Sequence, residues 1–369
     1  MSDPKFLSRK DFSCLLDELI KAGYTCIGPV VRDNAIVFDT IESVNKLPQG
    51  VQITQEPGVY RLEHTNGKRL FSWSNGPQAL KPLMFRPREN LWVSERDENG
   101  TLCFTETLPD VHPIAVIGVR SCDIAALYIQ DKHFMHSAFP DPYYEQRRKK
   151  VFLVAVNCTH SSKTCFCVST GDGPGVTYGY DLALSELDEG FVIVARSTRG
   201  AEVLARLPVK DISPEQLEAA EKEILKAGQD QVRRMPSRNL RDPLFSRLEH
   251  PRWKEVAARC LSCGNCTSVC PTCFCHSENE QPSLDGTRSE HSREWDSCFT
   301  QGHSYIHGIT IRAETNTRYR QWLTHKLGSW HDQYGRSGCV GCGRCITWCP
   351  VGIDITEEAA AICGEGGHG

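Results

Sequence analysis

Three short apolar runs in the middle of the chain are the clearest structural signal. They cover residues 113–119, 151–156 and 191–195, and continuous apolar runs of this length are typical of strands buried on both faces of a sheet. Residues 123–134 lie between the first two runs and predict a helix. We therefore expect residues 106–235 to form an α/β domain.

Two helical signals flank these runs. Residues 12–22 predict a helix, and the short strands and turn residues after it indicate that residues 1–105 form an α+β region. A further helix is predicted to begin after Ser213, an N-cap residue that is followed by Pro214 at the first helical position and Gln216 at the capping-box position.

The number and position of the cysteines indicate a further domain at the end of the chain. The chain has 369 residues, 19 of them cysteines, and a net charge of −4. Many of the cysteines fall in residues 251–369, which a segment rich in Pro, Arg and Asp at 236–250 separates from the rest as the predicted linker. The negative charge argues against a protein that binds nucleic acid through overall basicity.

The N-terminal residues and the apolar runs bear on the compartment. The first residues lack the apolar core and cleavage site of a signal peptide, and no apolar run reaches the roughly 18 to 20 residues that span a bilayer. We therefore expect a cytoplasmic chain without membrane contact. Because cytosolic thiols stay reduced, many cysteines there indicate metal binding rather than disulfides.

Two cysteine motifs in the last domain share one spacing. Both follow C-x2-C-x2-C-x3-C-P, the bacterial ferredoxin spacing for [4Fe–4S] clusters, and they comprise Cys260, Cys263, Cys266 and Cys270 before Pro271, and Cys339, Cys342, Cys345 and Cys349 before Pro350. Three thiolates three residues apart let one loop hold three corners of a cubane. The glycine after the second cysteine, Gly264 or Gly343, permits a positive φ and close approach of backbone N–H groups.

The fourth cysteine of each motif is expected to reach the other cluster. One cluster then takes Cys260, Cys263, Cys266 and Cys349, and the other takes Cys339, Cys342, Cys345 and Cys270. Zinc is the alternative, but a structural zinc site needs two cysteine pairs rather than two runs of four with proline after each.

About 70 residues separate the two motifs, including the helix-forming residues 318–323. The predicted fold is therefore an α/β (α+β) N-terminal region followed by a mainly helical ferredoxin-like domain that holds two [4Fe–4S] clusters. Four cationic residues of this insert either offset the negative clusters or lie on a solvated helix face: Arg312, Arg318, Arg320 and Lys326.

A third group of cysteines follows the predicted strands. Cys122 and Cys158 come directly after the first two apolar runs, and Cys165 and Cys167 lie a few residues further on. Ligands collect beyond the carboxyl ends of parallel strands, so these four thiols predict a third [4Fe–4S] cluster. The alternative is buried cysteines without a ligand role.

Some residues near these motifs have no assigned partner. Asp123 and His160 are candidate ligands or supporting groups of the third site. Cys273, Cys275 and Cys298 are either buried thiols beside a cluster, exchangeable ligands or ligands of another metal.

Several segments resemble the beta subunit of cytosolic sulfhydrogenase-type [NiFe] hydrogenases: residues 118–127, 157–159, 165–167, 179–184, 270–275, 295–298 and 325–327. The electron-transfer subunit of anaerobic sulfite reductases, a protein of the same [4Fe–4S] dicluster type, is similar over the same stretches. The resemblance covers nearly the whole chain and favours the third cluster. One departure is Arg120-Ser121, where many relatives have a proline before the cysteine; it should change the loop shape but need not remove a ligand.

The resemblance implies an electron-transfer subunit rather than a catalytic one. Its expected partners are the small and large subunits of a [NiFe] hydrogenase together with a flavin- and NAD(P)-binding subunit; the alternative is the same relay in a sirohaem sulfite reductase. We find no GxGxxG, Walker or nickel-site sequence, so we expect no flavin, NAD(P) or catalytic residue on this chain. A redox-sensing protein and a zinc scaffold are further alternatives from other classes.

Overall fold

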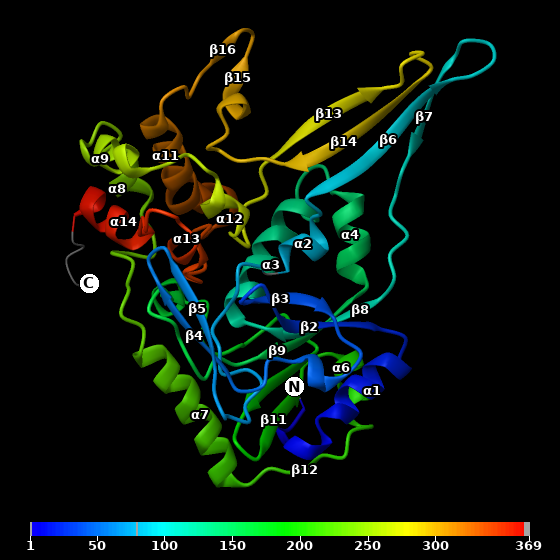
Figure 1. The fold of residues 1–369 in the computed structure, drawn as a ribbon, viewed down its shortest axis with the longest axis vertical. Helices are drawn as coiled ribbons and strands as arrows, with labels where there is room; N and C mark the ends of the chain where they lie inside the picture. The colour runs from blue at the N-terminus through cyan, green and yellow to red at the C-terminus, as the bar shows by residue number, and fades with distance from the viewer. Residues whose placement is uncertain (1, 79, 365–369) are drawn as a thin grey trace.

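The computed structural model describes residues 2–78 and 80–364 and is built around one large sheet (Figure 1). Among these residues the sheet has eight strands in the order β12-β1-β11-β10-β9-β8-β2-β3. Strands β2, β8, β9 and β10 are parallel to their neighbours in this group, and the others pair antiparallel. The bounds are β1 (Lys5–Ser8), β2 (Thr25–Arg32), β3 (Ala35–Thr40), β8 (Ile114–Val119), β9 (Val151–Val156), β10 (Leu182–Glu186), β11 (Gly190–Ala195) and β12 (Lys210–Asp211).

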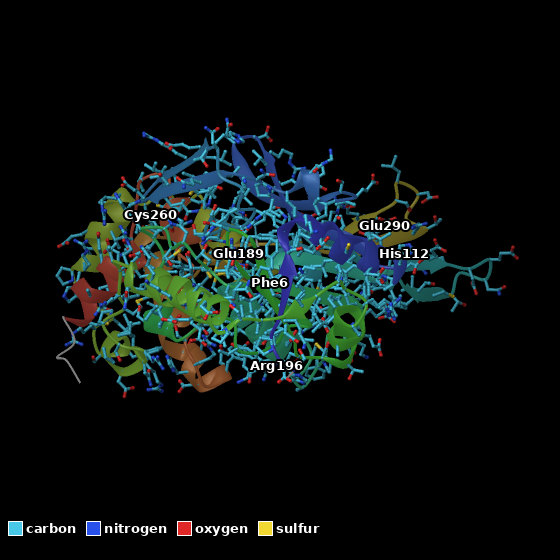
Figure 2. All side chains as sticks on the ribbon, turned by 90° about the horizontal axis from the view of Figure 1, so that it is seen from below. Phe6, His112, Glu189, Arg196, Cys260 and Glu290 are labelled. Atoms are coloured by element: carbon cyan, nitrogen blue, oxygen red, sulfur yellow. The ribbon has the colours of Figure 1, made fainter. Side chains whose placement is uncertain are left out.

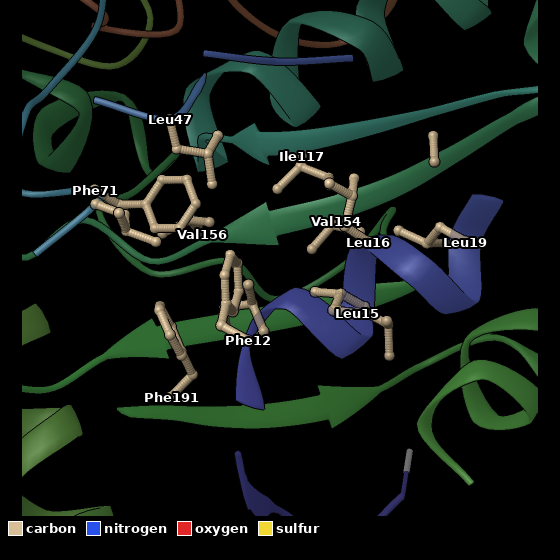
Figure 3. Packing of buried hydrophobic residues seen from close by; sticks show 14 of the residues in the cluster. Phe12, Leu15, Leu16, Leu19, Leu47, Phe71, Ile117, Val154, Val156 and Phe191 are labelled. Carbon is tan, nitrogen blue, oxygen red and sulfur yellow. The ribbon is translucent and has the colours of Figure 1, made fainter. Parts of the chain in front are cut away.

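Strand β9 shows why the apolar runs form buried strands. All six of its residues are buried, and they alternate between two apolar cores because side chains on a strand point to opposite faces. Phe152 and Val154 pack in the core that includes Leu15 and Leu19 of α1 (Ser13–Lys21) (Figure 3). Val151, Leu153 and Ala155 pack in the core formed with α3 (Ser121–Phe134) and α4 (Pro142–Lys149).

The helices predicted from local signals are present. Helix α1 matches the prediction over 12–22, and α3 matches the one over 123–134. Helix α7 (Pro214–Gln229) begins as predicted: the Gln216 N–H donates to Ser213 Oγ at 3.3 Å, and the Ser213 N–H donates to Gln216 Oε1 at 3.1 Å. Residues 1–235 also contain the short helices α2 (Lys81–Met84), α5 (Cys167–Thr170) and α6 (Thr198–Leu204).

A long β arm extends from the body of the molecule (Figure 1). It is a four-stranded sheet of order β13-β14-β6-β7, built from β6 (Arg88–Arg96), β7 (Leu102–Glu106), β13 (His276–Pro282) and β14 (Arg288–Trp295). At its root the buried Glu89 of β6 lies between Arg147 of α4 and Arg293 of β14. The expectation of a mainly helical last domain therefore needs correction, because its residues 276–295 form a hairpin that pairs with the N-terminal region.

The remaining helices gather at the end of the molecule that carries Cys260, away from the Glu290 of the arm (Figure 2). They are α8 (Arg241–Phe245), α9 (Arg252–Arg259), α10 (Asn265–Ser268), α11 (Thr315–Thr324), the π-helical turn η4 (His325–Ser329), α12 (Trp330–Tyr334), α13 (Arg344–Thr347) and α14 (Ile355–Cys363). Leu240 and Leu244, from the predicted linker, are buried in the core of this bundle.

Short elements complete the fold. They are the hairpin β4 (Val51–Glu56) and β5 (Val59–His64), the ribbon β15 (Tyr305–Ile306) and β16 (Ile309–Thr310), and the 3-10 turns η1 (Arg9–Asp11), η2 (Val44–Lys46) and η3 (Gln301–Ser304). No helix of the described residues is long and apolar enough to cross a bilayer.

Candidate metal centres

The thiols assigned to the first predicted cluster, called here the first set, line one cavity: Cys260, Cys263, Cys266 and Cys349. Cys260 follows α9, Cys266 lies in α10, and Cys349 comes shortly after α13. Aromatic side chains wall the same cavity, among them Phe299, Tyr319 and Trp322. Two motifs far apart in the sequence thus present thiols to one space with apolar walls.

Within the first set, burial acts most strongly on Cys266. It raises the pKa of the Cys266 thiol well above its usual value, and the nearby thiols of Cys260 and Cys349 raise it further. Crowded buried thiols resist ionisation, whereas metal coordination deprotonates them. Backbone N–H groups already point at two sulfurs: Ser262 donates to Cys260 Sγ at 3.4 Å and Ile353 to Cys349 Sγ at 3.3 Å. This donor set suits an iron–sulfur cluster, whose potential such bonds tune.

The second set consists of Cys339, Cys342, Cys345 and Cys270. Cys345 lies in α13, Cys270 follows α10, and the other two lie in the loop between α12 and α13. Burial raises the pKa of Cys339 to about 12, with the thiols of Cys342 and Cys270 adding to the effect. The Gly341 N–H donates to Cys339 Sγ at 3.5 Å. The pKa of Cys345 is likewise raised by burial and by the thiols of the other three, so the four are close enough to influence one another.

The third set consists of Cys122, Cys158, Cys165 and Cys167. Cys122 lies in the first turn of α3, just beyond β8, and Cys158 lies just beyond the adjacent parallel strand β9. Burial raises the pKa of Cys165 to about 11, and the Cys158 thiol raises it further. Burial also raises the pKa of Cys122, with Cys342 and Cys167 among the groups that add to it. The two strand ends thus bring Cys122 close to the segment that carries Cys158, Cys165 and Cys167.

Polar side chains from other segments support the third set. Gln231 Nε2 donates to Cys167 Sγ at 3.1 Å, and Ser162 Oγ lies 3.2 Å from Cys165 Sγ. Neither residue was predicted from the sequence. Ser162 lies within the cysteine loop, but Gln231 follows α7 and has no local signal that connects it with a thiol.

The second and third sets are in direct contact. The Phe166 N–H donates to the Gly341 carbonyl at 2.9 Å. Gly341 has φ +64°, and a Cβ on it would lie only 2.5 Å from the Cα of Cys167. Only glycine permits this approach, so the second motif packs closely against the loop of the third set.

Buried cations surround these sets. Arg344 of α13 forms an ion pair with Asp123 of α3 at 2.8 Å, and both side chains are almost fully buried. Arg120 donates to the carbonyl of Phe71 at 2.8 Å and to that of Trp73 at 2.5 Å. Asp123 also accepts from the Arg120 N–H at 3.2 Å, so its role in this structure is an ion pair and a helix cap.

Of the four cationic residues predicted in the insert, only Lys326 is fully buried, whereas Arg312, Arg318 and Arg320 are half-buried. Lys326 is buried, donates to Thr272 Oγ1 at 2.9 Å, and has a raised pKa because the Cys270 and Cys273 thiols outweigh burial. Arg318 and Arg320 instead donate to backbone carbonyls. Burial lowers the pKa of His160, the other candidate near the third set.

The first comparison with known proteins concerns the last domain. A family model described as a 4Fe-4S dicluster domain matches residues 259–353, a span that contains every cysteine of the first and second sets. Sulfhydrogenase 2 subunit beta of Pyrococcus furiosus is 32% identical over 301 residues, which cover 80% of this chain and 86% of that protein. The chain belongs to the sulfhydrogenase beta-subunit family. No solved structure shows a significant match.

Membership of the sulfhydrogenase beta-subunit family confirms the resemblance inferred from the sequence, and the dicluster domain identifies iron–sulfur clusters as the cofactor class.

Two of the cysteines that belong to none of the three sets form a further group with a histidine. Cys275, Cys298 and His303 each offer a ligand atom within 4.8 Å of the other two. His303 was not among the predicted residues.

Proposed function

We propose that this chain relays single electrons between the small and large subunits of a cytoplasmic [NiFe] hydrogenase on one side and a flavin- and NAD(P)-binding subunit on the other. The observation that carries the proposal is the first set, in which four thiols from two ferredoxin motifs line one cavity with apolar walls. The family supports the assignment, because the relative is named as a hydrogenase subunit.

The ligand assignment is part of the proposal. The first and second sets would each hold one [4Fe–4S] cluster, and the third set would hold another. When bound, such clusters take up and release one electron at a time. The donor chemistry fits, since each set offers four cysteine thiols and thiolates are the usual ligands of these clusters.

The residues around the thiols have separate tasks. The rings of Tyr319 and Trp322 help to keep water from the first set. Lys326 and Arg344 bring buried positive charge to the second set, which offsets the charge of thiolates in a low-dielectric interior. Gln231 and Ser162 direct polar groups at sulfur in the third set. None of these tasks needs a substrate pocket, flavin or NAD(P) on this chain.

The test of the assembly is its composition after anaerobic purification from the native host. Nickel and flavin in stoichiometric amounts with this chain would support the hydrogenase relay. Sirohaem without nickel would overturn the hydrogenase assignment and place the chain in a sulfite reductase. Purification of the chain alone, without either partner group, would contradict the relay itself.

The number of clusters is tested on the same material. Three four-iron clusters require about 12 iron and 12 acid-labile sulfide per chain. About 8 of each would remove the third set from the proposal and leave the two sets of the dicluster domain.

A further inference from the structure

The base of the β13–β14 hairpin brings together three metal-ligating side chains outside the three sets. Cys275 directly precedes β13, Cys298 comes shortly after β14, and His303 lies in η3. The Asp296 N–H donates to the Cys275 carbonyl at 2.9 Å, which continues the strand pairing one step beyond the hairpin. The paired strand ends therefore bring Cys275 close to the segment that carries Cys298.

The distance between the two sulfurs distinguishes a shared metal ion from a disulfide or an iron–sulfur cluster. Cys275 Sγ and Cys298 Sγ lie 3.7 Å apart. Two thiolates about 2.3 Å from one tetrahedral ion lie about 3.8 Å apart. A disulfide needs a separation of about 2.05 Å, and the thiolates of a cubane bind separate irons at different corners. The observed spacing fits two ligands that share one ion.

Asp296 already orients the histidine. Its Oδ2 lies 2.8 Å from His303 Nδ1, and its Oδ1 accepts from the Ser297 N–H at 2.7 Å. Metal-ligating histidines almost always donate their other ring N–H to a carboxylate, a carbonyl or water. Because Nδ1 is engaged in this way, Nε2 is the nitrogen left to offer a lone pair to a metal.

We propose that Cys275, Cys298 and His303 bind one mononuclear divalent ion of the zinc class, with Asp296 as a positioning residue. Zinc is bound in tetrahedral sites by thiolate and imidazole, and a site with three protein ligands takes water in the fourth position. Cys275 and Asp296 also line a cavity of about 260 Å³, from which that water would come.

The ion would link the base of the arm, through Cys275 and Cys298, to His303 of η3. Its binding displaces the two thiol protons, which leave to solvent. The site does not depend on the electron-transfer proposal, because none of its ligands belongs to the first, second or third set. The two proposals can therefore fail separately.

The test uses the full-length chain, purified anaerobically from cells supplied with zinc. We expect about one zinc per chain beside the iron, and zinc K-edge X-ray absorption should show two sulfurs near 2.3 Å and one nitrogen near 2.0 Å. Cys298→Ser and His303→Gln should each lose the zinc while the iron content and the visible cluster absorption stay unchanged. Unchanged iron shows that the variants fold.

Matched variants separate ligands from neighbours. Cys273→Ser, two residues from Cys275 but outside the group, should keep its zinc. Asp296→Asn should weaken zinc affinity about 10- to 100-fold in competition with a chelator, and Asp296→Glu should bind more tightly than Asp296→Asn. Three results would overturn the proposal: no zinc in the wild-type chain, loss of about four iron atoms in Cys298→Ser, or a disulfide between Cys275 and Cys298 in the native protein.

Discussion

The first and third sets show two ways in which a chain can gather four thiols. The first set takes three of its cysteines from one short segment, and aromatic and aliphatic side chains line its cavity. The third set takes Cys122 and Cys158 from the ends of two adjacent strands and receives polar groups from Gln231 and Ser162. Local spacing specifies the first set, whereas the third exists only when the large sheet is assembled.

The comparison is most sharply tested by removing one thiol from each set. Cys349→Ser and Cys158→Ser should each lose about four iron atoms per chain, because a cubane that lacks one ligand is not retained. Iron and sulfide analysis of the anaerobic protein measures this. Cys103→Ser, at an exposed thiol of β7, is the control and should keep all its iron. Full iron content in Cys158→Ser would show that the third set holds no cluster, and the comparison would then be between a cluster site and a group of buried thiols.

The next effect concerns the contact between the second and third sets. Asp123→Asn leaves the buried Arg344 without its charge partner, which should lower the free energy of unfolding by about 3 to 5 kcal/mol. Asp332→Asn removes a similar partner from Arg241, but those side chains are about half exposed. That change should cost far less, because solvent screens an exposed ion pair. Urea unfolding of the full chain under anaerobic conditions compares the two. Equal midpoints would mean that the buried pair does not join the two sets.

A smaller effect is expected where α3 meets the dicluster domain. The ring of His133 stacks on Phe274 with centroids 3.7 Å apart, and its Nδ1 lies 2.9 Å from the Tyr334 hydroxyl. Burial lowers the pKa of His133 to about 4 from its usual 6.5. The folded chain therefore keeps His133 neutral while the unfolded chain protonates it, so stability present above about pH 6.5 is lost as the pH falls towards 4.

Thermal unfolding across that pH range measures the effect. His133→Gln removes the titrating ring, so its unfolding midpoint should fall less steeply with decreasing pH than that of the wild-type chain. His307→Gln, in the turn between β15 and β16, should keep the wild-type slope. A wild-type slope in His133→Gln would show that this junction does not respond to protonation.

Local signals were sufficient for the parts of the molecule that short segments specify. The alternating burial of β9, the capping box of α7 and the spacing of the two ferredoxin motifs each follow from neighbouring residues. The position of the third set was also accessible, because adjacent parallel strands end on the same side of a sheet.

The features that were missed depend on pairings between distant segments. Strand β14 pairs with β6, which lies about 200 residues earlier. The sequence of either strand alone does not predict which strand it pairs with. His303 comes close to Cys275 only because that hairpin forms, and Gln231 reaches Cys167 only because α7 packs where it does. Pairing between distant segments produces no hydrophobic periodicity that a single sequence would reveal.

The smallest expected effect tests the polar surroundings that distinguish the third set. Gln231 Nε2 donates to Cys167 Sγ at 3.1 Å, and such bonds stabilise the more negative, reduced form of a cluster. Gln231→Met should therefore lower the reduction potential of one cluster. A net hydrogen bond of about 0.5 to 1.5 kcal/mol corresponds to roughly 20 to 60 mV for one electron. A redox titration of the anaerobic full chain, followed by electron paramagnetic resonance, measures the shift. Gln216→Met, in the capping box of α7, alters a glutamine that bonds to Ser213 and not to sulfur, so all potentials should stay in place. Equal reduction potentials in Gln231→Met and the wild-type chain would mean that Gln231 positions the loop of the third set without changing the potential of its cluster. The first and third sets would then differ in how the chain assembles them but not in the electrostatic environment of their sulfurs.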